Sequence, residues 1–230
     1  MIKKKLGIIG GMGPLATAVF YEKTAEMTPA SCDQDHIVTY IISDPEIPKR
    51  VEYILGEPVP SPGPYLSEIA LRLQDMGAEI IVMPCVTAHF FYREIAEKLS
   101  VKMLNILEET CKALTDKGIK KAGILATRAT LKSAILQNAL TESGIDSVLP
   151  EEDEVNEISR IIFSEIKAGK KADLKSLYHI MDNMKGRGAE TALIACTDLS
   201  AALHGADGKD RFTDLLDLLA AAAVRECLGC

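Results

Sequence analysis

Two cysteines occupy matching positions in two apolar segments of the chain, residues 80–87 and 191–198. Each segment is an apolar strand pattern that ends at a cysteine, Cys85 or Cys196, and continues into Thr87 or Thr197. The pKa of a cysteine lies within about two units of neutrality, so thiol and thiolate are both accessible after modest tuning. A helix that begins beside the sulfur favours the thiolate. We therefore predict a pair of proton-transfer groups, against the alternative of two buried apolar residues.

The segments that must position these thiols alternate between strand and helix patterns. Strands are predicted at 6–9, 37–42, 80–83, 121–125 and 193–195, and helices at 15–27, 65–76, 90–99, 106–117, 131–143, 154–167, 172–185 and 215–227. This alternation is typical of an α/β fold. Strands this apolar are buried on both faces in parallel sheets, which bind ligands beyond the carboxyl ends of their strands. Both cysteines are predicted at such ends.

The two halves of the chain resemble each other. A glycine-bearing strand opens each half, at residues 7–10 and 123–126, and each is followed after a similar length of chain by its cysteine. We predict two similar parallel-sheet domains with the active-site cleft between them. The first consists of residues 1–105 plus 210–230 and carries Cys85; the second consists of residues 106–209 and carries Cys196.

A glycine-rich turn at residues 10–14 follows the first strand and opens a helix. The backbone amides of Gly11, Met12 and Gly13 are candidate anion donors, aided by the helix dipole. The spacing is not Gly-x-Gly-x-x-Gly, and the acidic candidate at a strand end, Asp44, lies 31 residues after Gly13 rather than about 20. A small carboxylate is therefore favoured over a dinucleotide. The alternative is a tight turn without a ligand.

Five further polar residues are candidates for binding a substrate. Thr87 and Thr197 can cap helices after the cysteine-bearing strands and offer hydroxyls to a ligand. Thr127 and Thr130 flank the turn after the strand at 121–125, where they bind a second anion or cap a helix. Arg50 is predicted in a loop after a strand, where a guanidinium meets a carboxylate or is simply solvated.

Two other charged or titratable residues have more ordinary interpretations. His89 lies four residues after Cys85 and is a candidate general base, although local packing or capping is the favoured interpretation. By its position before a glycine, Lys167 is typical of a cation at the carboxyl end of a helix. No Ser-His-Asp arrangement or Gly-x-Ser-x-Gly motif is recognisable in the sequence.

Composition limits the possible partners. A net charge of -7 and a pI near 5.2 argue against nucleic acid and anionic membrane surfaces. No apolar run has the length of a signal peptide core or a membrane span, so a cytoplasmic location is expected. The six cysteines are then expected to be free thiols. Cys227 and Cys230 have Cys-x-x-Cys spacing but stand alone, and no metal site is predicted.

Several ordered motifs together resemble the aspartate/glutamate racemase superfamily, most closely its aspartate racemase branch. They are residues 7–14 with Ala16 and Thr17, residues 47–50, residues 83–89, residues 123–127 and residues 195–197. The resemblance implies two flavodoxin-like domains, a homodimer, and racemisation of a small amino acid without pyridoxal phosphate, metal or another cofactor. It also implies that Cys85 and Cys196 are the catalytic pair and that Arg50 and Lys167 are cations near the substrate.

The chain resembles a divergent member of this superfamily, because it departs from the usual pattern at sites near the expected substrate. Val86 replaces the Asn that normally follows the first cysteine, Val51 replaces a Thr, and Asp198 replaces a Glu. Ala129 and Leu136 replace the usual Gly and Tyr. Because specificity depends on buried hydrogen bonds to the substrate, these changes leave open which amino acid is bound. The predicted substrate-binding residues are Gly11, Met12, Gly13, Arg50, Val86, Thr87, Thr127, Thr130, Lys167 and Thr197.

Three functions follow from these observations. The leading one is a racemase acting on aspartate, glutamate or a related amino acid: one thiolate removes the α-proton and the opposite thiol returns another. The second is an isomerase or decarboxylase of the same superfamily that uses one cysteine. The third is an amino-acid-binding homologue that has lost catalysis.

Overall fold

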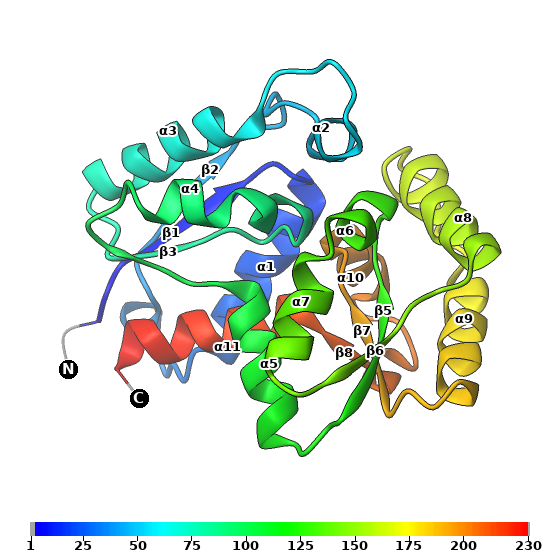
Figure 1. Cartoon of the computed structure of the whole chain (residues 1–230). Helices are drawn as coiled ribbons and strands as arrows, with labels where there is room; N and C mark the ends of the chain where they lie inside the picture. Colours follow the sequence, from blue (N-terminus) through cyan, green and yellow to red (C-terminus); the bar gives the residue numbers. More distant parts are fainter. Residues whose placement is uncertain (1–2, 230) are drawn as a thin grey trace.

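The computed structural model describes residues 3–229, and these form two four-stranded sheets side by side (Figure 1). In the first sheet the strand order is β2 (Thr39–Ser43), β1 (Leu6–Gly10), β3 (Ile80–Val82) and β4 (Lys102–Met103). In the second it is β6 (Asp146–Val148), β5 (Lys121–Leu125), β7 (Thr191–Ile194) and β8 (Phe212–Asp214). Every strand pair is parallel. The predicted α/β fold with two similar parallel sheets is confirmed.

Helices cover both sheets. Their bounds are α1 (Pro14–Met27), α2 (Arg50–Leu55), α3 (Pro62–Asp75), α4 (Tyr92–Ala96), α5 (Ile106–Asp116), α6 (Arg128–Ser133), α7 (Ile135–Glu142), α8 (Glu152–Arg160), α9 (Leu174–Gly186), α10 (Thr197–Leu203) and α11 (Leu215–Leu228). Short 3-10 segments are η1 (Asp33–Asp35), η2 (Thr87–Phe91) and η4 (Lys209–Arg211), and a π-helical segment, η3 (Ile161–Ile166), continues α8. None of the helices within residues 3–229 combines the length and apolar character needed to cross a bilayer.

The strand order places the ligand-binding edge of each sheet. In the first sheet the chain leaves β1 in both directions, to β2 on one side and β3 on the other, and β5 has the same position in the second sheet. Crevices form at the carboxyl ends of strands where the order reverses in this way. The turn after β1 and the segments that follow β3, β5 and β7 therefore meet at such edges, and these segments contain most of the residues predicted to be functional.

The two halves are held together by a shared core. Leu6 and Ile8 of β1, Ile124 of β5 and Leu219 of α11 belong to one cluster of fully buried apolar side chains. Figure 1 shows α11 (red) running from the second sheet to below the first, and it contacts β3, β7, α1 and α5. Burial of this apolar surface from both halves stabilises their relative orientation.

The predicted domain boundaries remain a prediction. The last helix does pack on α1, as expected for a return to the first half. However, β8 is hydrogen-bonded to β7 in the second sheet, so a division by sheets falls after Asp214 rather than at residue 210. Cys230, the last residue of the predicted first domain and of the Cys-x-x-Cys motif, lies outside the described residues.

Candidate active site

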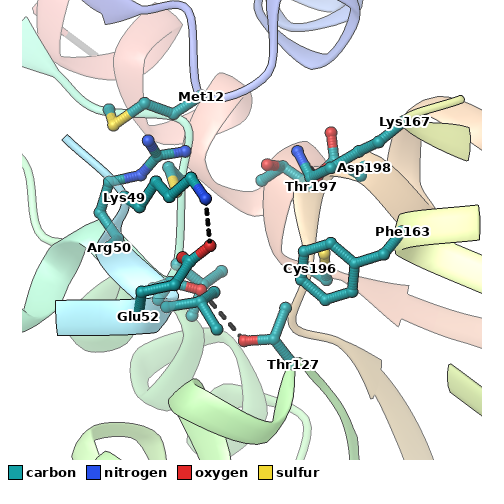
Figure 2. A pocket seen from close by; sticks show the side chains of 14 residues that line it. Met12, Lys49, Arg50, Glu52, Thr127, Phe163, Lys167, Cys196, Thr197 and Asp198 are labelled. Carbon is teal, nitrogen blue, oxygen red and sulfur yellow. Dashed lines mark hydrogen bonds and ion pairs between the residues drawn. The ribbon is translucent and has the colours of Figure 1, made fainter. Parts of the chain in front are cut away.

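A cavity of about 270 Å³ lies where the carboxyl ends of the two sheets face each other (Figure 2). The first half contributes residues from the turn after β1 and from the start of α2: Met12, Lys49, Arg50, Val51 and Glu52. It also contributes the segment after β3: Cys85, Val86 and Thr87. The second half contributes Thr127, Phe163, Lys167, Cys196, Thr197 and Asp198. The predicted pair of cysteines therefore lines a single cavity.

Cys85 follows β3, lines the cavity and is buried. Burial raises the pKa of its thiol, and the positive charge of Arg50 opposes that shift. The backbone N–H of Ala88 also favours the thiolate, whereas the carboxylate of Asp198 disfavours it. The strongest charge acting on this sulfur is thus a cation.

Cys196 is the N-cap residue of α10 and is also buried. Burial, followed by the negative charge of Asp198, raises the pKa of this thiol to about 12. The backbone amides of Leu199 and Asp198 act in the opposite direction and are outweighed. The amides at the start of each helix do favour the thiolate, as expected, but the net pKa of both thiols is raised because removal from water disfavours the charged form more strongly.

Three threonine hydroxyls form a network across the cleft. Thr87 Oγ1 lies 2.8 Å from Thr130 Oγ1 and 3.3 Å from Thr127 Oγ1, and the last two are 3.0 Å apart. Thr127 caps α6 by accepting the N–H of Thr130, as predicted. Neither Thr87 nor Thr197 makes a side-chain cap, which corrects that prediction. Thr87, Thr127 and Thr197 line the cavity, whereas the fully buried Thr130 stands behind it.

The glycine-rich turn contributes less to the cavity than predicted. The N–H of Gly11 donates to Thr17 Oγ1 at 3.0 Å, and the Thr17 hydroxyl donates to Gly13 O at 2.9 Å. Gly11 has φ +92°, and a Cβ there would lie 2.2 Å from the carbonyl oxygen of Asp44. Only Met12 of this turn lines the cavity. The amide of Gly11 is therefore committed to closing the turn and does not serve as an anion donor.

Arg50 begins α2 rather than lying in the predicted loop, but it does line the cavity. Its Nη1 donates to the backbone oxygens of Ile47 at 3.1 Å and Pro48 at 3.3 Å. Among residues 3–229 no carboxylate forms an ion pair with this guanidinium. These contacts hold Arg50 in place while leaving its charge available to a ligand.

Lys167 follows the π-helical segment η3 and lines the opposite wall. Its Nζ forms an ion pair of 2.7 Å with Asp198 Oδ2, and Figure 2 shows the two side chains converging at the top of the cavity. The change from α to π geometry alters which residues of the helix face the cavity. Phe163, from the same segment, projects into the cavity in front of Cys196 in Figure 2.

Five lining residues were not among the predicted site residues: Lys49, Val51, Glu52, Phe163 and Asp198. Lys49 and Glu52 form an ion pair of 3.2 Å at the start of α2. That helix has six residues, too few for an amphipathic pattern to be recognised in the sequence. Phe163 lies in the segment 154–167 predicted as helical, and the sequence carries no signal that its side chain, 43% accessible in the structure, lines a cavity.

His89 packs locally, as the favoured interpretation held. Its Nδ1 lies 2.9 Å from the carbonyl oxygen of Cys85, and Nε2 accepts the N–H of Ile106 at 3.2 Å. Burial lowers the pKa of the imidazole to about 4, so the ring is neutral at pH 7. With Nε2 accepting, Nδ1 carries the proton and donates to Cys85 O. Both nitrogens are occupied by backbone, and His89 fixes the strand end rather than acting as a base.

Among residues 3–229, the cysteines outside the cavity and the acidic residues form no further metal or catalytic centre. Cys32, Cys111 and Cys227 are free thiols outside the cavity. Within the part of the chain that the structure describes, no group of three or more His, Cys, Asp or Glu side chains could hold a metal ion.

Comparisons with known proteins agree with this architecture. The chain is 30% identical to the broad specificity amino-acid racemase RacX of Bacillus subtilis, over 97% of this chain and 98% of that protein. Its fold matches the Picrophilus torridus aspartate racemase with a TM-score of 0.82 and 31% identity, covering 98% of this chain and 94% of the other. An aspartate racemase homologue from Pyrococcus horikoshii has the same fold, with a TM-score of 0.78, 23% identity, and coverage of 98% and 99%. The family model for Asp/Glu/Hydantoin racemases matches residues 9–225. With two sheets of matching topology and one shared cavity, this chain belongs to the Asp/Glu/Hydantoin racemase family.

Proposed function

We propose that this protein racemises an amino acid with Cys85 and Cys196 as its two proton-transfer groups. The observation that carries the proposal is that two buried cysteines, one from each half, line the same small cavity. Inversion at a carbon requires a base on one face and an acid on the other. Two thiols at equivalent ends of two similar sheets supply that arrangement.

The reaction begins with one thiolate and one thiol. The thiolate sulfur takes the α-proton, and the electron pair of the broken C–H bond passes into the carboxylate to give an enediolate. The opposite thiol then donates its proton to the other face of the α-carbon. Each turnover exchanges the protonation states of the two cysteines, so the reverse reaction uses them in opposite roles.

The charges around the thiols favour Cys85 as the resting thiolate. Arg50 is the strongest charge acting on Cys85 and lowers its pKa, while Asp198 is the strongest charge acting on Cys196 and raises its pKa. A substrate carboxylate bound at Arg50 would partly neutralise its positive charge, so that Arg50 would stabilise the Cys85 thiolate less before proton transfer. Transfer of charge from sulfur to the enediolate then keeps the negative charge beside the same guanidinium.

The remaining groups can orient the amino acid. Arg50 is free of carboxylate partners among residues 3–229 and is suited to the α-carboxylate. The hydroxyls of Thr87 and Thr127 have lone pairs beyond those used in their network and are suited to the ammonium group. They can replace the substrate contact that Val86 cannot make. No cofactor takes part in this proposal, and the homodimer expected from the family resemblance stays a prediction.

The test is α-hydrogen exchange in deuterated buffer, followed by chiral chromatography, over a panel of acidic and neutral amino acids. Incorporation of deuterium with inversion is expected for the wild type. Cys85→Ser and Cys196→Ser should each lose at least a thousandfold in racemisation. Cys111→Ser removes another buried thiol outside the cavity and serves as the matched control. Full racemisation by both cavity variants would refute the two-thiol mechanism.

The same panel separates the alternatives. Release of carbon dioxide identifies a decarboxylase, and a covalent adduct on one cysteine identifies the single-cysteine isomerase. Calorimetric binding without exchange identifies a binding protein. The binding protein is favoured by one observation: burial raises the pKa of both thiols, which disfavours the thiolate that proton transfer needs.

A further inference from the structure

Five charged side chains line the cavity, and four of them are already paired. Lys49 pairs with Glu52 at 3.2 Å, and Lys167 pairs with Asp198 at 2.7 Å. Arg50 is the fifth, and its guanidinium contacts backbone oxygens only, among the residues that the structure describes. The cavity therefore offers one cation without a carboxylate partner.

One available cation accommodates one carboxylate. Given the proposed function, on which this inference rests, the α-carboxylate of the substrate occupies Arg50. A second carboxylate, on a substrate side chain, would have to take Lys49 from Glu52 or Lys167 from Asp198. Either exchange leaves a carboxylate of the protein facing a carboxylate of the ligand, with no gain in the number of ion pairs.

Glu52 is placed to enforce this restriction. Its side chain is 30% accessible, whereas that of Lys49 is 73% accessible, so the anion is the more deeply buried partner of the pair. In Figure 2 the carboxylate of Glu52 points into the cavity on the wall opposite Phe163. Repulsion between like charges is stronger at such a partly buried position than in water.

The rest of the cavity wall favours uncharged groups. Val51, Val86, Phe163 and Met12 supply apolar surface to the same cavity. We propose that Glu52 is a specificity-determining residue that excludes dicarboxylic amino acids, so that the preferred substrates have a side chain without negative charge.

The inference is tested by comparing the exchange rate of aspartate with that of asparagine, and of glutamate with that of glutamine. The members of each pair have nearly the same shape and differ in charge. The wild type should exchange the α-hydrogen of the amide member at least tenfold faster, at equal subsaturating concentration. Glu52→Gln removes the repelling carboxylate and releases Lys49 as a second cation. This variant should shift the ratio toward the dicarboxylic amino acid by tenfold or more.

Two controls isolate the cause. Glu57→Gln makes the same charge change at an exposed position just after α2, outside the cavity, and should leave the ratio unchanged. In the double variant Lys49→Gln with Glu52→Gln, the repulsion is removed but no cation is released, so the shift should be smaller than in Glu52→Gln alone. Faster exchange of the dicarboxylic members by the wild type, or equal ratios for Glu52→Gln and Glu57→Gln, overturns the inference.

Failure of the proposed function gives a different result. If none of the four amino acids exchanges, their dissociation constants are measured by calorimetry with the same variants. If the wild type binds the amides more tightly than the acids, and Glu52→Gln reverses or removes that difference, the specificity role of Glu52 is supported without catalysis. Equal binding of acid and amide by the wild type contradicts it.

Discussion

Lys167 and Asp198 form an ion pair of 2.7 Å at the top of the cavity in Figure 2, and Asp198 lies two residues after Cys196 in the chain. The lysine arrives from the π-helical segment and the aspartate from the start of α10. The pair thus connects two elements of the second half and sets the local charge beside one of the two cysteines.

Removing the negative charge of Asp198 should make Cys196 easier to ionise. Asp198 raises the pKa of both thiols, and in Asp198→Asn Lys167 is also released to favour the thiolates. The acid limb of the pH profile of kcat/KM should therefore move to lower pH, by about one unit or more. Asp207→Asn, an exposed site, is the control for a change in net charge. An unmoved acid limb would show that Asp198 does not tune the thiols.

The threonine network should stabilise the contact between the two halves. Thr130→Val removes a fully buried hydroxyl and leaves Thr87 and Thr127 without one of their partners. Loss of a buried hydrogen-bond partner costs roughly 1–3 kcal/mol in the free energy of unfolding. Denaturant titration measures this loss, with the exposed Thr141→Val as the control. Equal stability of the two variants would contradict the structural role.

A comparison of Gly11 with Gly56 distinguishes the cost of a steric clash from the cost of a left-handed backbone conformation. Both have positive φ, +92° and +91°, but a Cβ would lie 2.2 Å from Asp44 O at Gly11 and would meet nothing within 4 Å at Gly56. Gly56→Ala should lose about 1–2 kcal/mol of unfolding free energy from the left-handed backbone alone. Gly11→Ala should lose at least twice as much, and it should also disturb Met12 in the cavity. Thermal and denaturant unfolding of both variants provides the comparison.

Asp214 should make stability decrease with pH in the mildly acidic range. Burial, and to a smaller degree Asp217, raises the pKa of its carboxyl to about 6, while Ser200, the N–H of Leu216 and Lys23 oppose the shift. The native state then binds more protons than the unfolded state between about pH 4 and pH 6, so the contribution of Asp214 is complete below that range and is lost above it.

Asp214→Asn removes this titration while keeping an oxygen that can accept from Ser200 and Leu216. The unfolding free energy of the wild type relative to the variant should therefore fall by up to roughly 3 kcal/mol from pH 4 to pH 7. Solvent access to part of the carboxyl reduces that figure. A constant difference between the two proteins over this pH range would exclude the assigned titration.

The strongest sequence patterns gave the most accurate predictions. The apolar runs at β1, β3, β5 and β7 predicted the four central strands because residues buried on both faces must be continuously apolar. The strands β4, β6 and β8 have two or three residues and carry too little pattern to be distinguished from loops. Helix α2 was missed for the same reason, and with it the position of Arg50 on a helix. For α10 the sequence predicted only a helix start after Cys196 and gave no bounds.

The sequence by itself determined the α/β class, the duplicated design and the two cysteines at strand ends. These depend on local periodicity and on chemistry that each residue carries with it. Only the tertiary structure decided that both cysteines line one cavity, that burial raises their pKa values, and that Glu52, Phe163 and Asp198 join them. Those properties arise from atoms distant along the chain, since desolvation and charge pairing depend on what folding brings within a few ångströms.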